Sequence, residues 1–285
     1  MIVAPFIRTE ALIRLLDCIS ADVKITIVTR WRPADLLAGT SDLDIYDATV
    51  SKGIKLYLRW DLHAKLFAAD DQCLAGSANV TLTALGWRMP ANLELLVPVL
   101  RSTDHIIQFE EQLFKGTVRA TAEQRNRLAE LIDRLRDSHV QIPKSEGEES
   151  DSLRPGWVPR TRNPEELYSV YQGNSDIGHS IQQVMQEELT QIGVIPGMRE
   201  DMFREWVSAV ISQTPLVEKV IHRIEQKGQV TESDMSVFLT EIGVDTKINR
   251  PRDVLETLRR WLTYFLPDHY ETAQDSIKLI KVKTL

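Results

Sequence analysis

Short apolar, β-branched segments alternate with amphipathic segments over the first hundred residues. Strands are predicted at 2–6, 23–29, 54–59 and 92–100, and the second contains the run Val-Lys-Ile-Thr-Ile-Val-Thr. Apolar residues three or four apart predict helices at 9–18, with Thr9 as the cap, and at 33–37 and 44–51. Strands that alternate with helices favour an α/β layered sheet.

Beyond residue 100 the pattern becomes helical. Helices are predicted at 103–115, 121–140, 164–171, 177–192, 200–211 and 216–226. The stretch between the second and third of these contains KSEGEESDS and RPGWVPRTRNP, a composition that suits an ordered core poorly. We therefore predict a first domain at 1–142 with trailing helices, an acidic and proline-containing linker at 143–163, and a mainly helical domain at 164–285.

The last seventy residues have the order helix, helix, helix, hairpin. Thr231 to Asp234 forms a capping-box-like start for a short helix to 242, and the helix at 251–265 carries three arginines. A hairpin is predicted at 269–282, around Gln274 and Asp275. This order is the plan of a winged helix-turn-helix from about residue 214, whose third helix can read a major groove. The charges here roughly cancel, so a helical dimerisation or partner-docking domain is an equal alternative.

The segment from Tyr57 to Trp87 carries the chemistry. His63 and Lys65 are two apart on a predicted strand, so they share a face about 6.6 Å from each other, and the intervening apolar residues face a core. A tight turn at 70–72 and a short return strand at 73–75 lead to Gly-Ser-Ala-Asn at 76–79. Thr81 to Leu85 is predicted to be the first turn of a helix. An imidazole, an ammonium, a hydroxyl and an amide would then meet at a helix N-terminus, which favours phosphate.

This pattern resembles the H-x-K-x4-D and G-S-x-N signature of the phospholipase D superfamily. The matching residues span seventeen positions and are His63, Lys65, Asp70, Gly76, Ser77 and Asn79. Five residues separate Asp70 from Gly76, where the usual form has six. The resemblance covers about residues 1–100 and implies the mixed-sheet α/β/α sandwich of that family.

The resemblance implies a phosphodiesterase that needs no metal and no cofactor. His63 would attack phosphorus to form a phosphohistidine, while Lys65, Asn79 and Ser77 hold the phosphoryl oxygens. A second imidazole must protonate the leaving group. The chain has a single H-x-K, so the resemblance implies a homodimer in which His63 of each subunit meets the other across a twofold axis.

The supporting residues are open to more than one interpretation. Glu94, or Asp70 in the turn, would hold the imidazole tautomer. Thr81, at the start of its predicted helix, is a candidate for substrate binding. Arg30, at the end of a predicted strand, would contact a substrate phosphate or form a surface ion pair.

Composition narrows the function classes. The chain has 285 residues, enough for two domains, with 43% hydrophobic and 26% charged residues, as in globular proteins. It contains no apolar run of roughly 18 residues and no basic leader, so we expect a cytoplasmic protein that is not a membrane protein. Cys18 and Cys73 are expected to be buried free thiols. The net charge of −7 argues against a uniformly basic nucleic-acid coat but not against a local basic cleft.

Three functions remain open. The first is an endonuclease, with DNA favoured over RNA as its substrate, that the helical domain guides to nucleic acid or to the other proteins of a bacterial phage-defence complex. The second is a phospholipase or phosphatidyl transferase, against which the family's usual two motifs per chain argue. The third is a non-catalytic nucleic-acid-binding or scaffold protein with the same fold.

Overall fold

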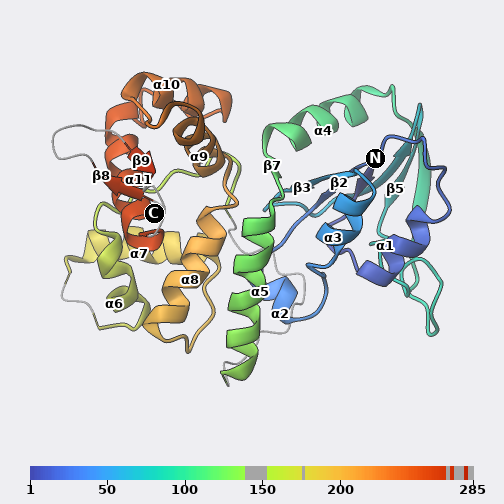
Figure 1. The fold of residues 1–285 in the computed structure, drawn as a ribbon, viewed down its shortest axis with the longest axis horizontal. Helices are drawn as coiled ribbons and strands as arrows, with labels where there is room; N and C mark the ends of the chain where they lie inside the picture. The colour runs from blue at the N-terminus through green and yellow to red at the C-terminus, as the bar shows by residue number, and fades with distance from the viewer. Residues whose placement is uncertain (139–152, 175–176, 268–269, 273–278, 282–285) are drawn as a thin grey trace. The chain divides into compact units, whose positions relative to one another are not determined.

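The computed structural model describes residues 1–138, 153–174, 177–267, 270–272 and 279–281 (Figure 1). The chain divides into two compact units, Met1–Glu146 and Gly147–Leu285. Within the described residues, the first unit is an α/β structure built on a seven-stranded mixed sheet, and the second unit is mainly helical. These two fold classes and their order along the chain confirm the sequence prediction.

The sheet of the first unit combines a parallel centre with antiparallel flanks. Its strands are β1 (Ile2–Val3), β2 (Thr26–Thr29), β3 (Lys55–Leu58), β4 (Lys65–Ala69), β5 (Gln72–Gly76), β6 (Leu96–Leu100) and β7 (Val118–Arg119). They lie in the order β6-β5-β4-β1-β2-β3-β7. β1, β2 and β3 are parallel, and each of the remaining strands is antiparallel to its neighbours. The carboxyl ends of β1, β2, β3 and β5 therefore share one edge with the amino ends of β4 and β6.

Helices cover both faces of this sheet. They are α1 (Thr9–Leu16), α2 (Pro33–Leu37), α3 (Ile45–Ser51), α4 (Asp104–Lys115) and α5 (Ala122–Asp137). Figure 1 shows α4 on one side of the sheet and α1 and α3 on the other. On the α4 side, Leu113 packs with strand residues that include Val3, Val28 and Leu66. This buried apolar layer fixes the strands and thereby the ends that carry the polar groups.

Several predicted strands are shorter than the hydrophobic pattern suggested. β2 begins at Thr26 and β6 at Leu96, while a loop at 59–64 divides β3 from β4 and contains His63, which was predicted to lie on the same strand as Lys65. The division has a topological cause. β4 pairs with β1 and not with β3, so the chain must cross the ends of β2 and β1 before it can pair again.

The start and the end of α1 also differ from the prediction. The side chain of Thr9 does not cap the helix; instead, Asp42 accepts a 2.8 Å hydrogen bond from the Thr9 backbone N–H. The helix ends at Leu16, which leaves Cys18 exposed, so the prediction that both thiols are buried is wrong for this residue. Cys73 is buried, as predicted, and burial raises the pKa of its thiol.

The second unit packs its helices around large aromatic side chains. Its elements are η1 (Pro164–Glu166), α6 (Leu167–Tyr171), α7 (His179–Ile192), α8 (Glu200–Ile211), α9 (Pro215–Lys227), α10 (Glu232–Glu241), α11 (Pro251–Phe265), β8 (Tyr270–Thr272) and β9 (Leu279–Lys281). Phe203, Trp206 and Trp261 are almost fully buried. No helix among the described residues is both long and apolar enough to cross a membrane.

The carboxyl-terminal order of three helices and an antiparallel strand pair matches the predicted order. The capping box at Thr231 and Asp234 is present, and β8 pairs with β9. The predicted hairpin turn at Gln274 and Asp275 lies outside the described residues.

The described part of the predicted linker contributes to the packing of the second unit. Leu153 and Trp157 are buried, and the Trp157 ring meets that of Trp261 edge-on at 5.6 Å. Glu188, which is 1% exposed, accepts hydrogen bonds from the backbone N–H groups of Arg160 and Thr161 at 2.6 and 3.1 Å. Burial raises the pKa of the Glu188 carboxyl. Residues 153–163 are thus attached to α11 by aromatic packing and to α7 by a buried carboxylate.

Candidate active site

The polar residues of the signature gather where the sheet brings unlike strand ends together. β4 begins at Lys65, directly opposite Gly76 at the end of β5, and Gly76 is in turn opposite Leu96 at the start of β6. His63, Ser77 and Glu94 adjoin these three strand ends. In open α/β sheets, ligands bind beyond the carboxyl ends of parallel strands, and β1 and β2 end at this same edge.

His63 and Lys65 are placed by the entry into β4. His63 is exposed, and Lys65 is partly buried. The Lys65 ammonium donates a 2.8 Å hydrogen bond to the backbone carbonyl of His63, so it lies beside the backbone of that residue. Leu62 and Leu66 are buried in the core and Ala64 packs against it, as the alternation predicted.

The charge of Lys65 is set by its surroundings at the strand ends. Burial lowers its pKa, the positive charge of Arg30 lowers it further, and the negative charge of Glu94 acts in the opposite direction. Lys65 therefore interacts electrostatically with groups from the end of β2 and from the segment before β6. A partly desolvated ammonium that is only partly neutralised is suited to hold an anion.

Ser77 and Glu94 form a hydrogen-bonded pair. The Ser77 hydroxyl donates to Glu94 Oε2 at 2.5 Å and accepts from the backbone N–H of Leu95 at 3.0 Å. The Asn92 side-chain amide donates to Glu94 Oε1 at 3.1 Å. Both carboxylate oxygens of Glu94 are thus held in place, and Glu94 precedes β6 instead of lying within it.

Asn79 is anchored to the end of β1. Its side-chain Oδ1 accepts a 3.4 Å hydrogen bond from the backbone N–H of Phe6. The next residue, Val80, pairs with Ile7 in an isolated bridge, which draws the chain after β5 towards the end of β1. This anchoring orients the side-chain amide of Asn79, whose Nδ2 group is the remaining donor.

The helix predicted to begin at Thr81 is absent. Residues 81–90 form turns, although the Leu85 N–H does bond to the Thr81 carbonyl and the Thr81 hydroxyl accepts from the Ala84 N–H at 3.2 Å. Gly86 then takes a left-handed conformation, with φ of 70°, which ends the turn. A helix N-terminus therefore does not supply the anion-binding groups, and Thr81 uses its hydroxyl within its own turn.

Two other predicted site residues lie elsewhere. Asp70 occupies the turn between β4 and β5, five residues along the hairpin from Lys65, and is therefore roughly 16 Å from the site. Arg30 is buried, and its guanidinium pairs with Asp35 at 2.8 Å and donates to the Leu62 carbonyl at 2.9 Å. The predicted ion pair of Arg30 exists but is buried, and it supports the loop that leads to His63.

Sequence reasoning missed a second group of residues at the ends of β2 and β3. Arg32 donates from Nε to the Trp60 carbonyl at 2.9 Å, and its guanidinium lies 5.6 Å from the centre of the Trp60 ring. Arg59 pairs with Asp61 at 2.6 Å. The repeated pattern of an arginine and a tryptophan directly after two strands was the available signal. The pattern brings these side chains together because β2 and β3 are parallel neighbours, so that their carboxyl ends lie at the same edge of the sheet.

A comparison of the chain with models of known protein families found no match. A comparison with curated proteins found no significant match. The assignment of this site therefore rests on the local signature and on the geometry of the strand ends.

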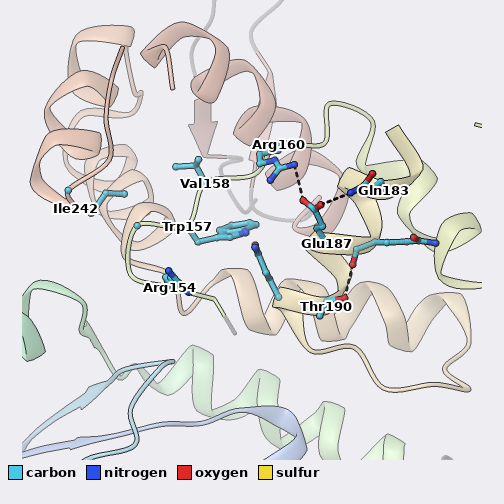
Figure 2. Close-up of a pocket in the computed structure, with 12 residues that line it drawn as sticks. Arg154, Trp157, Val158, Arg160, Gln183, Glu187, Thr190 and Ile242 are labelled. Atoms are coloured by element: carbon cyan, nitrogen blue, oxygen red, sulfur yellow. Dashed lines mark hydrogen bonds and ion pairs between the residues drawn. The ribbon is translucent and has the colours of Figure 1, made fainter. Parts of the chain in front are cut away.

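The second unit contains a cavity of about 920 Å³ that is a weaker candidate (Figure 2). Figure 2 shows Trp157 at its centre and Arg160 directed towards Glu187, with which it forms a 3.1 Å ion pair. The remaining described lining residues are mainly glutamine, threonine, glycine and aliphatic residues, together with Arg154. This set contains no histidine, cysteine or serine to act as a nucleophile, whereas the strand-end site provides an imidazole and an ammonium together.

Proposed function

We propose that this protein is a metal-independent phosphodiesterase that acts as an endonuclease. We also propose that its first unit is a phospholipase D-like α/β/α sandwich. One observation carries the proposal. The imidazole of His63, the ammonium of Lys65, the hydroxyl of Ser77 and the amide of Asn79 lie at one sheet edge, where they come from two chain segments, the entry into β4 and the exit from β5. A phosphoryl group needs a nucleophile together with donors and positive charge around its oxygens, and this edge supplies both.

The proposed reaction has two steps. In the first, a ring nitrogen of His63 attacks phosphorus, the bond to the leaving oxygen breaks, and a second imidazole gives that oxygen a proton. In the second, the same second imidazole takes a proton from water, the water oxygen attacks phosphorus, and the phosphorus–nitrogen bond breaks. Lys65 and Asn79 hold the remaining phosphoryl oxygens in both steps.

Glu94 serves as a positioning residue in this proposal. Its two oxygens are already fixed by Ser77 and Asn92, and its charge favours the charged form of Lys65. It thereby keeps an ammonium available at a site where burial and Arg30 oppose the charge.

The second imidazole is proposed to come from His63 of a second copy of the chain. The segment that adjoins the site exposes apolar side chains: Leu93 is 102% exposed, Leu95 67% and Val97 46%. β6 is also an edge strand of the sheet. Exposed apolar patches and open strand edges commonly mark interaction sites, and a homodimer on this surface would place two identical sites near each other.

Cleavage of nucleic acid in the presence of EDTA tests the proposed activity. The wild-type chain should nick plasmid DNA with excess EDTA, and His63→Ala should abolish nicking. His105→Ala, which alters an exposed histidine on α4, is the matched control and should retain activity. Rapid quenching with labelled substrate should trap label on the wild-type protein and none on His63→Ala. Turnover of a phosphatidyl substrate without cleavage of DNA or RNA would favour the lipase alternative, and no turnover of either would favour a binding protein.

Mixing of subunits tests the shared site. Excess His63→Ala chain should lower the activity of wild-type chain more than dilution does, because mixed dimers contain one imidazole where the reaction needs two. Activity strictly proportional to the wild-type chain would show that each subunit works alone.

The second unit is proposed to direct the enzyme to its target. The order of α9, α10, α11 and the β8–β9 pair supports a winged-helix arrangement. Of the three arginines on α11, however, Arg260 pairs with Glu256, which reduces the positive charge available for DNA. This neutralisation favours docking to a protein partner, such as another member of a phage-defence complex, over reading of a major groove.

A further inference from the structure

Arg32 differs from the other two arginines that follow β2 and β3. Arg30 is paired with Asp35, and Arg59 is paired with Asp61 and also bonds to two backbone carbonyls. Arg32 uses only its Nε, in the 2.9 Å hydrogen bond to the Trp60 carbonyl. Among the described residues, no carboxylate oxygen lies within 4.0 Å of its guanidinium nitrogens, and its two Nη groups have no hydrogen-bond partner.

The Arg32 side chain is held in a fixed orientation despite this lack of a counter-ion. Its Nε is bonded on one side, and its guanidinium lies against the Trp60 ring at 5.6 Å. A guanidinium that is stacked and bonded through Nε presents its Nη groups as a planar fork, which matches two oxygens of a phosphate. Little side-chain freedom is then lost when an anion binds.

The electrostatic surroundings leave the positive charge of Arg32 incompletely balanced. Burial and the nearby charge of Arg30 lower its pKa to about 10, and the charges of Asp35 and Asp61 only partly oppose this effect. Both carboxylates are already paired with other arginines. An added anion would therefore relieve a like-charge repulsion between two arginines at this edge.

The position of Arg32 relates it to the proposed nucleophile. Arg32 holds Trp60, and His63 follows three residues later, so the Cα atoms of Trp60 and His63 are at most roughly 11 Å apart. Successive phosphates of a nucleic-acid strand rise by roughly 3.4 Å along the helix axis. The backbone at Trp60, to which Arg32 is bonded, and the backbone at His63 thus lie within a span that a few nucleotides cover.

We propose that Arg32 binds a second phosphate of the same substrate, a few nucleotides from the phosphate at His63, so that the site selects polynucleotides over substrates with one phosphodiester. This inference rests on the proposed phosphodiesterase function and specifies its substrate class. A phospholipid of the phosphatidyl type has one phosphodiester and would leave Arg32 unused.

Kinetics with two substrates test this role. Arg32→Gln should be compared with wild type on a single-stranded oligonucleotide of about 20 nucleotides and on bis(p-nitrophenyl) phosphate, which contains one phosphorus. The ratio of kcat/KM for the oligonucleotide to that for the small ester should fall roughly tenfold or more, the loss typical of a hydrogen bond to a charged group. Arg101→Gln removes an arginine at the opposite edge of the sheet, which is paired with Glu110, and should leave the ratio unchanged. An equal loss on both substrates, or no loss on either, would overturn the proposal.

A binding measurement separates failure of this inference from failure of the proposed function. With His63→Ala as the background, fluorescence anisotropy should show that Arg32→Gln lowers the slope of log affinity against log salt by about 0.7, the value for one phosphate contact on a single strand. An unchanged slope, or no binding of the oligonucleotide, would overturn the inference. The two failures are distinguishable. If Arg32→Gln lowers the slope as expected but the wild-type chain cleaves neither substrate, Arg32 is supported as a phosphate-binding residue and the phosphodiesterase function is refuted.

Discussion

Gly76 is the point at which β5 comes closest to the segment that carries Glu94. A Cβ atom at this position would lie 1.9 Å from the backbone oxygen of Leu95 and 2.9 Å from its carbonyl carbon. Both neighbours are backbone atoms, so no side chain can rotate away. Gly76→Ala therefore forces the 95–96 backbone away from β5.

The size of the perturbation follows from these distances. The contact to the Leu95 oxygen would be about 1.5 Å shorter than the 3.4 Å at which ordinary contact begins. Overpacking of this kind costs about 1–3 kcal/mol, and the lost hydrogen bonds between Ser77 and Leu95 add about 0.5–1.5 kcal/mol each. A total near 3 kcal/mol would lower the Tm of the first unit by about 10 °C. Because Glu94 and Ser77 would separate, cleavage should fall about 10- to 100-fold.

Thermal unfolding and plasmid nicking of the Gly76→Ala variant measure these effects. Gly178→Ser is the control, because a Cβ at Gly178 would have nothing within 4 Å and the residue precedes α7, where serine is a favoured cap. This control should keep its Tm and its activity. A Gly76→Ala variant with a Tm within about 2 °C of wild type and full activity would refute the close approach of the two strands and its role in the site.

Two further predictions concern charges at the strand ends. Glu94→Gln removes the charge that raises the pKa of Lys65, while burial and Arg30 continue to lower that pKa. The alkaline limb of the pH–rate profile should therefore move to lower pH. A limb that stays or moves to higher pH would contradict this coupling. Arg30→Gln should cost about 3–5 kcal/mol of stability by leaving buried Asp35 without its partner, and the double variant with Asp35→Asn should recover most of it in urea unfolding. Equal instability of the single and double variants would show that the loss does not come from an unpaired charge.

The features that the sequence predicted around the signature are those that local alternation and register determine. Leu62 and Leu66 enter the core and Asp70 occupies the turn, as the local pattern predicted, whereas His63 lies in the loop before β4 and not on a strand with Lys65. The fold class followed from alternation of strands and helices. These features depend on residues that are close in the chain.

The features that the sequence did not predict depend on long-range neighbours. The Arg30–Asp35 pair is buried only because α2 folds back over the end of β2, and the anchoring of Asn79 requires β1 to lie beside the chain after β5. Thr81 to Leu85 was predicted to be the first turn of a helix, but Gly86 ends the turn before a helix forms. The pairing of Ser77 with Glu94, seventeen residues later, depends on how the loop between them returns.

The position of Asp70 has a practical consequence for how such proteins are compared. Asp70 takes a left-handed conformation, with φ of 52°, at the far end of the β4–β5 hairpin, whereas Lys65 and Gly76 face each other at the near end. Residues inserted or removed at the tip change the spacing between Asp70 and Gly76 but leave the opposed pair at the base unchanged. A one-residue change in this spacing can therefore be absorbed at the tip, and the same tip offers an attachment point for a fluorescent label that would report on folding without disturbing the chemistry.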